Sequence, residues 1–286
     1  MLPELVLQQG LGGGAEVADR GGGEPERRGE RAELLVARHR RVTAGRSEAT
    51  GGIVSPGRSE ATGGMDSAEP EEPAQSLSRL VYSTVRERII LGQYPQGSRL
   101  PEQRIGEELN VSRVPLREAV PWLERDGFVR SRPRRGAVVV QWDAKAVDDL
   151  FDVRLSLEVG AARLAAREVG NGGPLAALNE ALEHAQRTVA GGDAYAIART
   201  STAFHEAVIE TSRNDLMTTL MKNISGRITW LFYLTSGLPA DEAFHDHVQL
   251  RDAIASGNER VAESVAYAHI ERDRLPTFEA MRGRLG

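Results

Sequence analysis

RLPEQRIGEELNVSRVPLREAVPWLERDGFVRSRPRRGAVVV, residues 99–140, is the stretch that decides the fold of the first folded part of this chain. Its apolar residues recur at roughly helical spacing, which predicts two consecutive short helices; they are Ile105, Leu109, Val114, Leu116, Val120 and Leu123. Asn110–Ser112 is the break between the helices. Ser112 suits the N-cap of the second helix because its hydroxyl can accept a free backbone N–H. Pro115 then falls in the first turn, where a missing N–H costs little.

The second helix carries arginines on one face. Arg113 and Arg117 are four residues apart and therefore share a side of the helix. A recognition helix presents guanidinium groups to base edges and phosphates in this way. Pro121 lies further along, where it removes one backbone hydrogen bond and clashes with the preceding turn. We expect the helix either to kink there or to end and restart at Trp122, so that Arg117 is disturbed more than Arg113.

Two short strand-like runs follow this helix, Phe128–Ser131 and Ala137–Val140. Between them Pro133–Gly136 forms a turn with two charges, Arg134 and Arg135. A two-stranded ribbon with a basic turn after two short helices is typical of a winged helix-turn-helix.

These features, in this order, resemble the GntR family of bacterial transcription regulators over residues 81–139. The resemblance is carried by G-x-x-x-x-G-x-x-L at Gly92–Leu100, V-S-R-x-P-x-R-E-A at Val111–Ala119, L-x-x-D-G at Leu123–Gly127 and R-G in the wing. It implies a homodimeric winged helix that binds double-stranded DNA at an inverted-repeat operator. The candidate DNA-binding residues are Arg104, Ser112, Arg113, Arg117, Arg134, Arg135 and Gly136.

The chain before this module differs in composition. Residues 1–64 are rich in Gly, Arg, Glu and Ala, and the octamer GRSEATGG occurs at 45–52 and again at 57–64. We expect residues 1–76 to be a disordered low-complexity extension. Met65 follows the second repeat and is the expected natural start. An acidic linker at 65–76 then leads to an amphipathic helix at 77–94 and to a DNA-binding domain at 77–141.

Charge separates the two folded parts. Residues 77–140 hold 12 arginines and 7 acidic residues, whereas residues 142–286 hold 15 basic and 21 acidic residues. The formal net charge of −5 therefore hides a basic module, which is the electrostatic footprint of phosphate binding. There is no cysteine, no signal peptide pattern and no apolar run long enough to span a membrane. We expect a cytoplasmic protein that is associated with the nucleoid when bound to DNA.

From residue 142 onward the pattern is helical. Glycine and asparagine clusters separate six apolar-periodic segments at 145–168, 174–190, 194–211, 215–235, 240–255 and 259–282. Short loops imply an antiparallel bundle of six helices, or seven if the first splits near Asp149. The predicted fold is therefore mainly α, with a winged helix-turn-helix, a small β wing and a helical domain at 142–286.

The helical part resembles the FCD ligand-binding domain of the FadR subfamily. The matching runs are D-x-R-x-x-L-E-x-x-A-A-R-L-A-A at Asp152–Ala166, F-H-x-A-V-I-E at Phe204–Glu210 and S-R-N-D-L-M at Ser212–Met217. The resemblance implies that His205, His247 and His269 bind a divalent metal, for which imidazoles suit Zn²⁺ or Ni²⁺. The family also supplies an Asp four residues before the first histidine. Here that residue is Ser201, a weak neutral ligand. Either metal binding is weakened or lost, or a coordination position is left for water or the effector.

Family members commonly sense organic acids, so the resemblance implies a small carboxylate effector. Arg154 and Arg227 match arginines of the family, and either can clamp a carboxylate through two parallel hydrogen bonds. The alternative for both is a surface or interhelical ion pair. Effector binding then changes operator affinity by linkage between the two sites. The sign of that change is open, although repression is the more usual mode in the family.

Two rival functions stay open at this point. A three-histidine metal centre can activate water, as in a hydrolytic enzyme, but no general base, nucleophile motif or phosphate loop accompanies it, so a non-enzyme is favoured. The other rival is a metal-sensing or purely dimerising bundle attached to a DNA-binding head. Coupling between metal and DNA affinity separates that reading from an effector-controlled regulator.

Overall fold

The structure is a computed structural model that describes residues 73–134 and 136–284. The predicted fold class is confirmed, because helices dominate these ranges and one two-stranded sheet lies among them. No helix within them is long and apolar enough to cross a membrane. The proposed extension and the start at Met65 fall outside the described residues. The two folded parts are called here the head, residues 73–140, and the bundle, residues 142–284.

The head begins with α2, Pro73–Ile90, followed by α3, Glu102–Leu109. The lead helix therefore starts four residues earlier than the predicted segment 77–94 and also ends earlier. Proline is favoured at the first helical position because its missing N–H has no helical partner there, which explains the start at Pro73. Gly92, with φ +74°, turns the chain after Ile90.

α4, Arg113–Arg125, follows the break at Asn110, which takes the left-handed conformation with φ 50° and ψ 46°. Ser112 holds the N-cap position in an extended conformation, as predicted, but its side chain makes no capping hydrogen bond. α4 runs through Pro121 as one helix. The prediction that the helix could end there and restart at Trp122 is therefore wrong.

One apolar residue of the predicted core faces outward. Val114 is 60% exposed, whereas Leu116 is 2% exposed. The sequence pattern assigns Val114 to the same apolar face as Leu116. Two residues turn a helix by more than half a circle, so the two side chains point to nearly opposite sides. The side that α4 turns inward is formed by Pro115, Leu116, Ala119 and Leu123.

The wing is an antiparallel hairpin of β1, Val129–Arg132, and β2, Gly136–Val139. Val129 pairs with Val139 and Arg132 with Gly136, and each of the four strand ends lies one residue from its predicted position. Arg134 in the turn has φ 62°, a conformation that costs a non-glycine residue energy. Arg135 lies outside the described residues.

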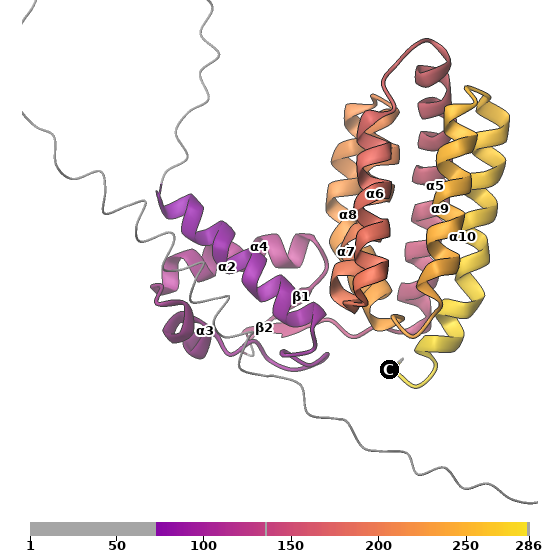
Figure 1. Ribbon diagram of the computed structural model, residues 1–286. Helices are drawn as coiled ribbons and strands as arrows, with labels where there is room; N and C mark the ends of the chain where they lie inside the picture. The colour runs from indigo at the N-terminus through magenta and orange to yellow at the C-terminus, as the bar shows by residue number, and fades with distance from the viewer. Residues whose placement is uncertain (1–72, 135, 285–286) are drawn as a thin grey trace, which may run out of the picture. The chain divides into compact units, whose positions relative to one another are not determined.

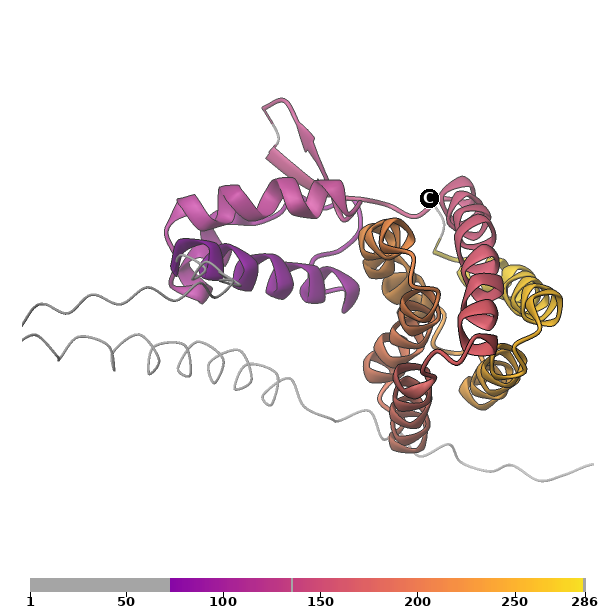
Figure 2. The same ribbon diagram turned by 90° about the horizontal axis from the view of Figure 1, so that it is seen from above.

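The bundle contains six helices within the part that is described, α5 to α10 (Figure 1). Their bounds are Ala144–Gly170, Ala176–Gly191, Ala194–Thr211, Asp215–Leu234, Ala240–Ala255 and Glu259–Met281. α5 passes through Asp149 without a break, so the seven-helix alternative is wrong. Figure 2 shows the helices of the bundle from above, with their axes running roughly along the line of sight.

α5 is the helix on which the bundle is assembled, because it packs against α7, α8, α9 and α10. Small residues on its inner face let neighbouring backbones approach closely; Ala161, Ala162, Ala165 and Ala166 are all fully buried. Larger side chains from the other helices fill the remaining space, among them Phe204, Val208 and Ile254. The functional side chains described below project into this interior.

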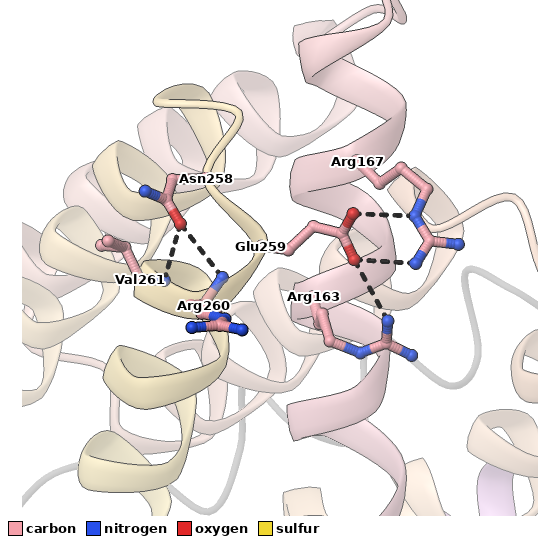
Figure 3. A network of polar contacts seen from close by, with 6 residues as sticks. All are labelled: Arg163, Arg167, Asn258, Glu259, Arg260 and Val261. Carbon is pink, nitrogen blue, oxygen red and sulfur yellow. Dashed lines mark hydrogen bonds and ion pairs between the residues drawn. The ribbon is translucent and has the colours of Figure 1, made fainter.

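An ion-pair cluster joins the start of α10 to α5 (Figure 3). Glu259 accepts hydrogen bonds from Arg167 at 3.0 and 2.8 Å and from Arg163 at 3.1 Å. One residue earlier, the Asn258 side chain caps α10 by accepting from the backbone N–H groups of Arg260 and Val261. The cluster holds the start of α10 against α5, the helix that carries Arg154, and the cap satisfies backbone N–H groups in the first turn of α10.

Candidate histidine site and DNA-binding face

Three histidines from three helices meet inside the bundle. His205 comes from α7, His247 from α9 and His269 from α10, and they are 1%, 3% and 2% exposed. Their ring centroids form a nearly equilateral triangle with sides of 5.0, 5.3 and 5.1 Å. One nitrogen from each ring lies within 4.8 Å of the others. The structure thus brings together the three residues that the sequence proposed as ligands.

The surroundings favour the neutral form of two of the imidazoles, those of His205 and His247. Burial lowers the pKa of His205, although the carboxylate of Glu158 opposes the shift. Burial also lowers the pKa of His247 well below its usual range, and the other two histidines and Arg154 add to this. A neutral imidazole offers a lone pair to a metal, whereas an imidazolium does not.

The residues present fit a divalent cation. Both ring nitrogens of His269 are buried without a hydrogen-bond partner, and a buried polar atom without a partner is costly unless a ligand supplies one. Three imidazoles are a donor set that Zn²⁺ and similar borderline ions prefer. Ser201 is half-buried one turn before His205, and no hydrogen bond joins it to the histidines in the part described.

A buried ion pair supports one of these histidines. Nε of Arg154 donates to Oε1 of Glu158 at 2.9 Å, and Oε2 of the same carboxylate lies 2.7 Å from Nδ1 of His205. Nη2 of Arg154 lies 3.3 Å from Nε2 of His205. Burial alone would raise the pKa of Glu158, but Arg154 and His205 hold it well below its usual range. The carboxylate is therefore ionised next to the histidine site.

Arg154 is fully buried and has one terminal nitrogen, Nη1, without a partner. Its guanidinium lies over the rings of Phe151 and Phe232 at 5.5 and 5.2 Å. Since Nε and Nη2 are already engaged, Arg154 offers an anion a single free nitrogen. A two-pronged clamp of the kind expected from the sequence requires Nη2 to leave His205.

The second arginine proposed for the effector lies elsewhere. The guanidinium of Arg227 is 5.3 Å from the ring of Trp142, and no hydrogen bond or ion pair links it to the three histidines among the described residues. His184 and His245 are exposed, as expected of histidines outside the site.

A shallow hollow of about 200 Å³ opens beside His269. Asp246 and Arg272 line it, with an ion pair between them at 2.5 Å, and Oδ2 of Asp246 lies 3.8 Å from Nδ1 of His269. Sequence reasoning assigned no role to Asp246 or Glu158. Glu158 stands in the matching run Asp152–Ala166 and four residues after Arg154, and Asp246 stands beside His247; these were their signals in the sequence.

The head presents an exposed basic face. Ser112, Arg113 and Arg117 are all exposed at the start of α4, and Arg134 is exposed in the wing. Arg104 is also exposed, but its Nε pairs with Glu108 at 2.5 Å. Gly136, with φ +70°, begins β2 beside the wing turn and is half-buried. The helix-turn-helix and the wing therefore supply cations on the elements that contact DNA in winged helices.

The fold and these sites define a two-domain bacterial transcription regulator. The model of the gntR family of bacterial regulatory proteins matches residues 77–139, and the FCD domain model matches residues 149–272. The chain belongs to the GntR family and carries an FCD domain. It is a DNA-binding transcription regulator and not an enzyme.

Relatives agree with this assignment. The chain is 27% identical over 195 residues to the HTH-type transcriptional regulator YdhC of Bacillus subtilis, covering 67% of this chain and 87% of that one. It is 29% identical to a probable D-xylose utilization operon transcriptional repressor of Paenarthrobacter nicotinovorans, over 66% of this chain and 85% of the relative. A solved GntR structure from Rhodococcus sp. RHA1 shares the fold, with a TM-score of 0.63, 24% identity and coverage of 72% and 99%.

Proposed function

We propose that this chain is a homodimeric repressor whose operator affinity is set by a small carboxylate bound in the helical bundle. The observation that carries the proposal is the buried meeting of His205, His247 and His269 beside Arg154. The imidazole nitrogens suit a metal ion, and the guanidinium of Arg154 beside them suits an anion. Together they suit a carboxylate that is bound to the metal.

His205, His247 and His269 would hold a divalent cation, Zn²⁺ or Ni²⁺, through one nitrogen each. The bound cation supplies positive charge and an open coordination position for a carboxylate oxygen. Nη1 of Arg154 has no hydrogen-bond partner among the described residues and would donate to the second carboxylate oxygen. Ser201 is the neighbouring hydroxyl on α7 that would bind the same ligand or a water molecule.

The DNA-binding step rests on the head. Arg113 and Arg117 would enter the major groove at each half of an inverted repeat, and Arg134 would contact the backbone from the wing. A two-fold operator requires two heads, which is why the proposal includes a homodimer. Arg135, which the sequence also assigns to DNA, lies outside the described residues and stays a prediction.

Linkage joins the two sites. If the carboxylate changes operator affinity by some factor, DNA changes carboxylate affinity by the same factor. The experiment is a fluorescence anisotropy titration of an operator selected in vitro, with the chain stripped of metal, then supplied with Zn²⁺, then with Zn²⁺ and a panel of small carboxylic acids.

We expect at least one acid to change operator affinity by about 5–150-fold, and only when Zn²⁺ is present. His205→Ala should abolish the response and leave basal operator binding unchanged. His184→Ala is the matched control, because that histidine is exposed. If Zn²⁺ alone shifts operator affinity and no acid adds to it, the chain senses metal; if neither does, the effector proposal fails.

A further inference from the structure

Glu158 is a buried carboxylate that holds two functional side chains at once. It is 3% exposed, and its two oxygens face different partners: Oε1 accepts from Nε of Arg154 at 2.9 Å, and Oε2 lies 2.7 Å from Nδ1 of His205. Arg154 and Glu158 are one turn apart on α5, whereas His205 comes from α7. The carboxylate therefore links two helices at the edge of the histidine cluster.

The contacts determine which nitrogen of His205 carries the proton. Arg154 can only donate, so Nε2 of His205, at 3.3 Å from Nη2, must be the acceptor. In a neutral imidazole the proton is then on Nδ1, where it donates to the ionised Glu158. The two neighbours select the same tautomer from opposite sides of the ring.

That tautomer is the one a metal site needs. A metal-bound histidine commonly donates its other N–H to a carboxylate, which fixes the orientation of the ring and makes the coordinating nitrogen more basic. Here the proton is on Nδ1, so Nε2 keeps its single lone pair, which in this structure accepts from Nη2 of Arg154 and can bind a cation once Nη2 moves aside. A ring free to rotate, or one with the proton on Nε2, would lose that lone pair.

We propose that Glu158 is the positioning residue of this site: it fixes His205 with Nδ1 protonated, so that the Nε2 lone pair is held by Nη2 of Arg154 in the metal-free protein and passes to the cation when Nη2 moves aside. This inference rests on the proposed function, because it concerns the cation of that site. It adds that one buried carboxylate, that of Glu158, contacts both the histidine that would bind the cation and the arginine that would bind the anion. The choice of tautomer, however, belongs to the metal-free protein and can be measured without any metal.

The first experiment reads the tautomer directly. The full chain, ¹⁵N-labelled at histidine and stripped of metal, is studied by long-range ¹H–¹⁵N correlation NMR, with His205→Gln identifying the signal. We expect His205 of the wild type to be neutral and protonated on Nδ1. In Glu158→Gln that population should fall. A wild-type His205 protonated on Nε2 would overturn the inference.

The second experiment measures Zn²⁺ affinity by competition with a chromophoric chelator. Glu158→Gln should weaken Zn²⁺ binding by about 10–100-fold, the usual effect of removing such a partner. Glu168→Gln, on the same helix, is the matched control and should bind like the wild type. Circular dichroism checks that each variant is folded.

A double variant separates positioning from charge balance. If Glu158 serves only to neutralise Arg154, then Arg154→Met combined with Glu158→Gln should restore Zn²⁺ affinity, because no buried charge is left unpaired. If Glu158 positions His205, affinity should stay about 10–100-fold weaker in the double variant. Restoration overturns the inference.

The outcomes distinguish this inference from the proposed function. If the wild type binds no Zn²⁺, the metal site and the role of Glu158 toward it both fail. If the wild type binds Zn²⁺, His205→Ala loses it and Glu158→Gln keeps it, only the inference fails.

Discussion

His205 and Glu158 lie 2.7 Å apart, from Nδ1 to Oε2, and both are buried in the bundle. The pair comes from two different helices and sits where three histidines meet. It connects the packing of the bundle to the chemistry of its interior, since the orientation of one ligand depends on a carboxylate held by Arg154.

The recognition helix offers a direct test of DNA recognition. Arg113→Ala should weaken binding to a selected operator by about 1–3 kcal/mol and relax base preference, because a bidentate contact to a base edge is lost. Arg134→Ala, in the wing, should weaken specific and random DNA alike and reduce the salt slope by about one. Both are measured by anisotropy over a series of salt concentrations.

The exposed arginine Arg187, on α6 of the bundle, provides the control for these variants. Arg187→Ala should leave operator binding unchanged. Equal losses of specific and random binding in Arg113→Ala would mean that α4 is not the recognition helix.

Pro121 should limit the stability of the head. It lacks the N–H that would bond to the carbonyl of Arg117, yet α4 continues past it. Pro121→Ala should therefore raise the free energy of unfolding by about 1–3 kcal/mol. Urea denaturation checks this, with Pro133→Ala in the wing turn as the control that restores no helical bond. An unchanged urea denaturation midpoint would show that α4 accommodates Pro121 without a loss of stability.

Val114 and Leu116 make a matched pair on α4. Leu116→Ala should cost about 2–5 kcal/mol, because it opens a cavity at a residue that is 2% exposed. Val114→Ala should change stability by no more than about 0.5 kcal/mol, since its side chain is 60% exposed. Similar losses in the two variants, measured by urea denaturation, would place Val114 in the core.

The neutral state of His247 should make metal-free stability depend on pH. Burial lowers the folded pKa of His247 well below its usual range, whereas in the unfolded chain it titrates near about 6.5. Below that pH the unfolded chain binds a proton that the folded chain does not. Stability is thus complete above about pH 6.5 and falls with decreasing pH by about 1.4 kcal/mol per unit for this group.

The check is urea unfolding in the presence of a chelator at a series of pH values below neutrality. His247→Phe should flatten the dependence, since a phenyl ring can keep the stacking on Phe204, now at 4.3 Å between centroids. His184→Phe changes an exposed histidine and should leave the slope as it is. A slope that His247→Phe does not alter would contradict a neutral buried imidazole.

Much of the fold could be predicted from periodicity and turn residues. The bundle helices were placed within a few residues because glycine or asparagine stands at nearly every break. Errors arose where a local rule had two outcomes. A helical apolar pattern includes Val114 although its face turns outward, and a mid-helix proline can either break or be tolerated in a helix such as α4.

The site was predictable only in part. The three histidines could be selected through the family resemblance, but their convergence depends on the packing of α7, α9 and α10, which no local pattern contains. Glu158 was missed because a carboxylate four residues after an arginine is equally typical of a solvent-exposed helical pair. Arg227 was included by the same resemblance, yet its guanidinium lies over Trp142.

The most direct test is metal analysis of the chain, purified without a histidine tag, beside the double variant His205→Ala, His247→Ala. We expect about one Zn or Ni per wild-type chain and none in the double variant. A wild-type chain that stays free of metal after incubation with excess ion would contradict it, and would mean that the site with Ser201 in place of Asp no longer takes a cation.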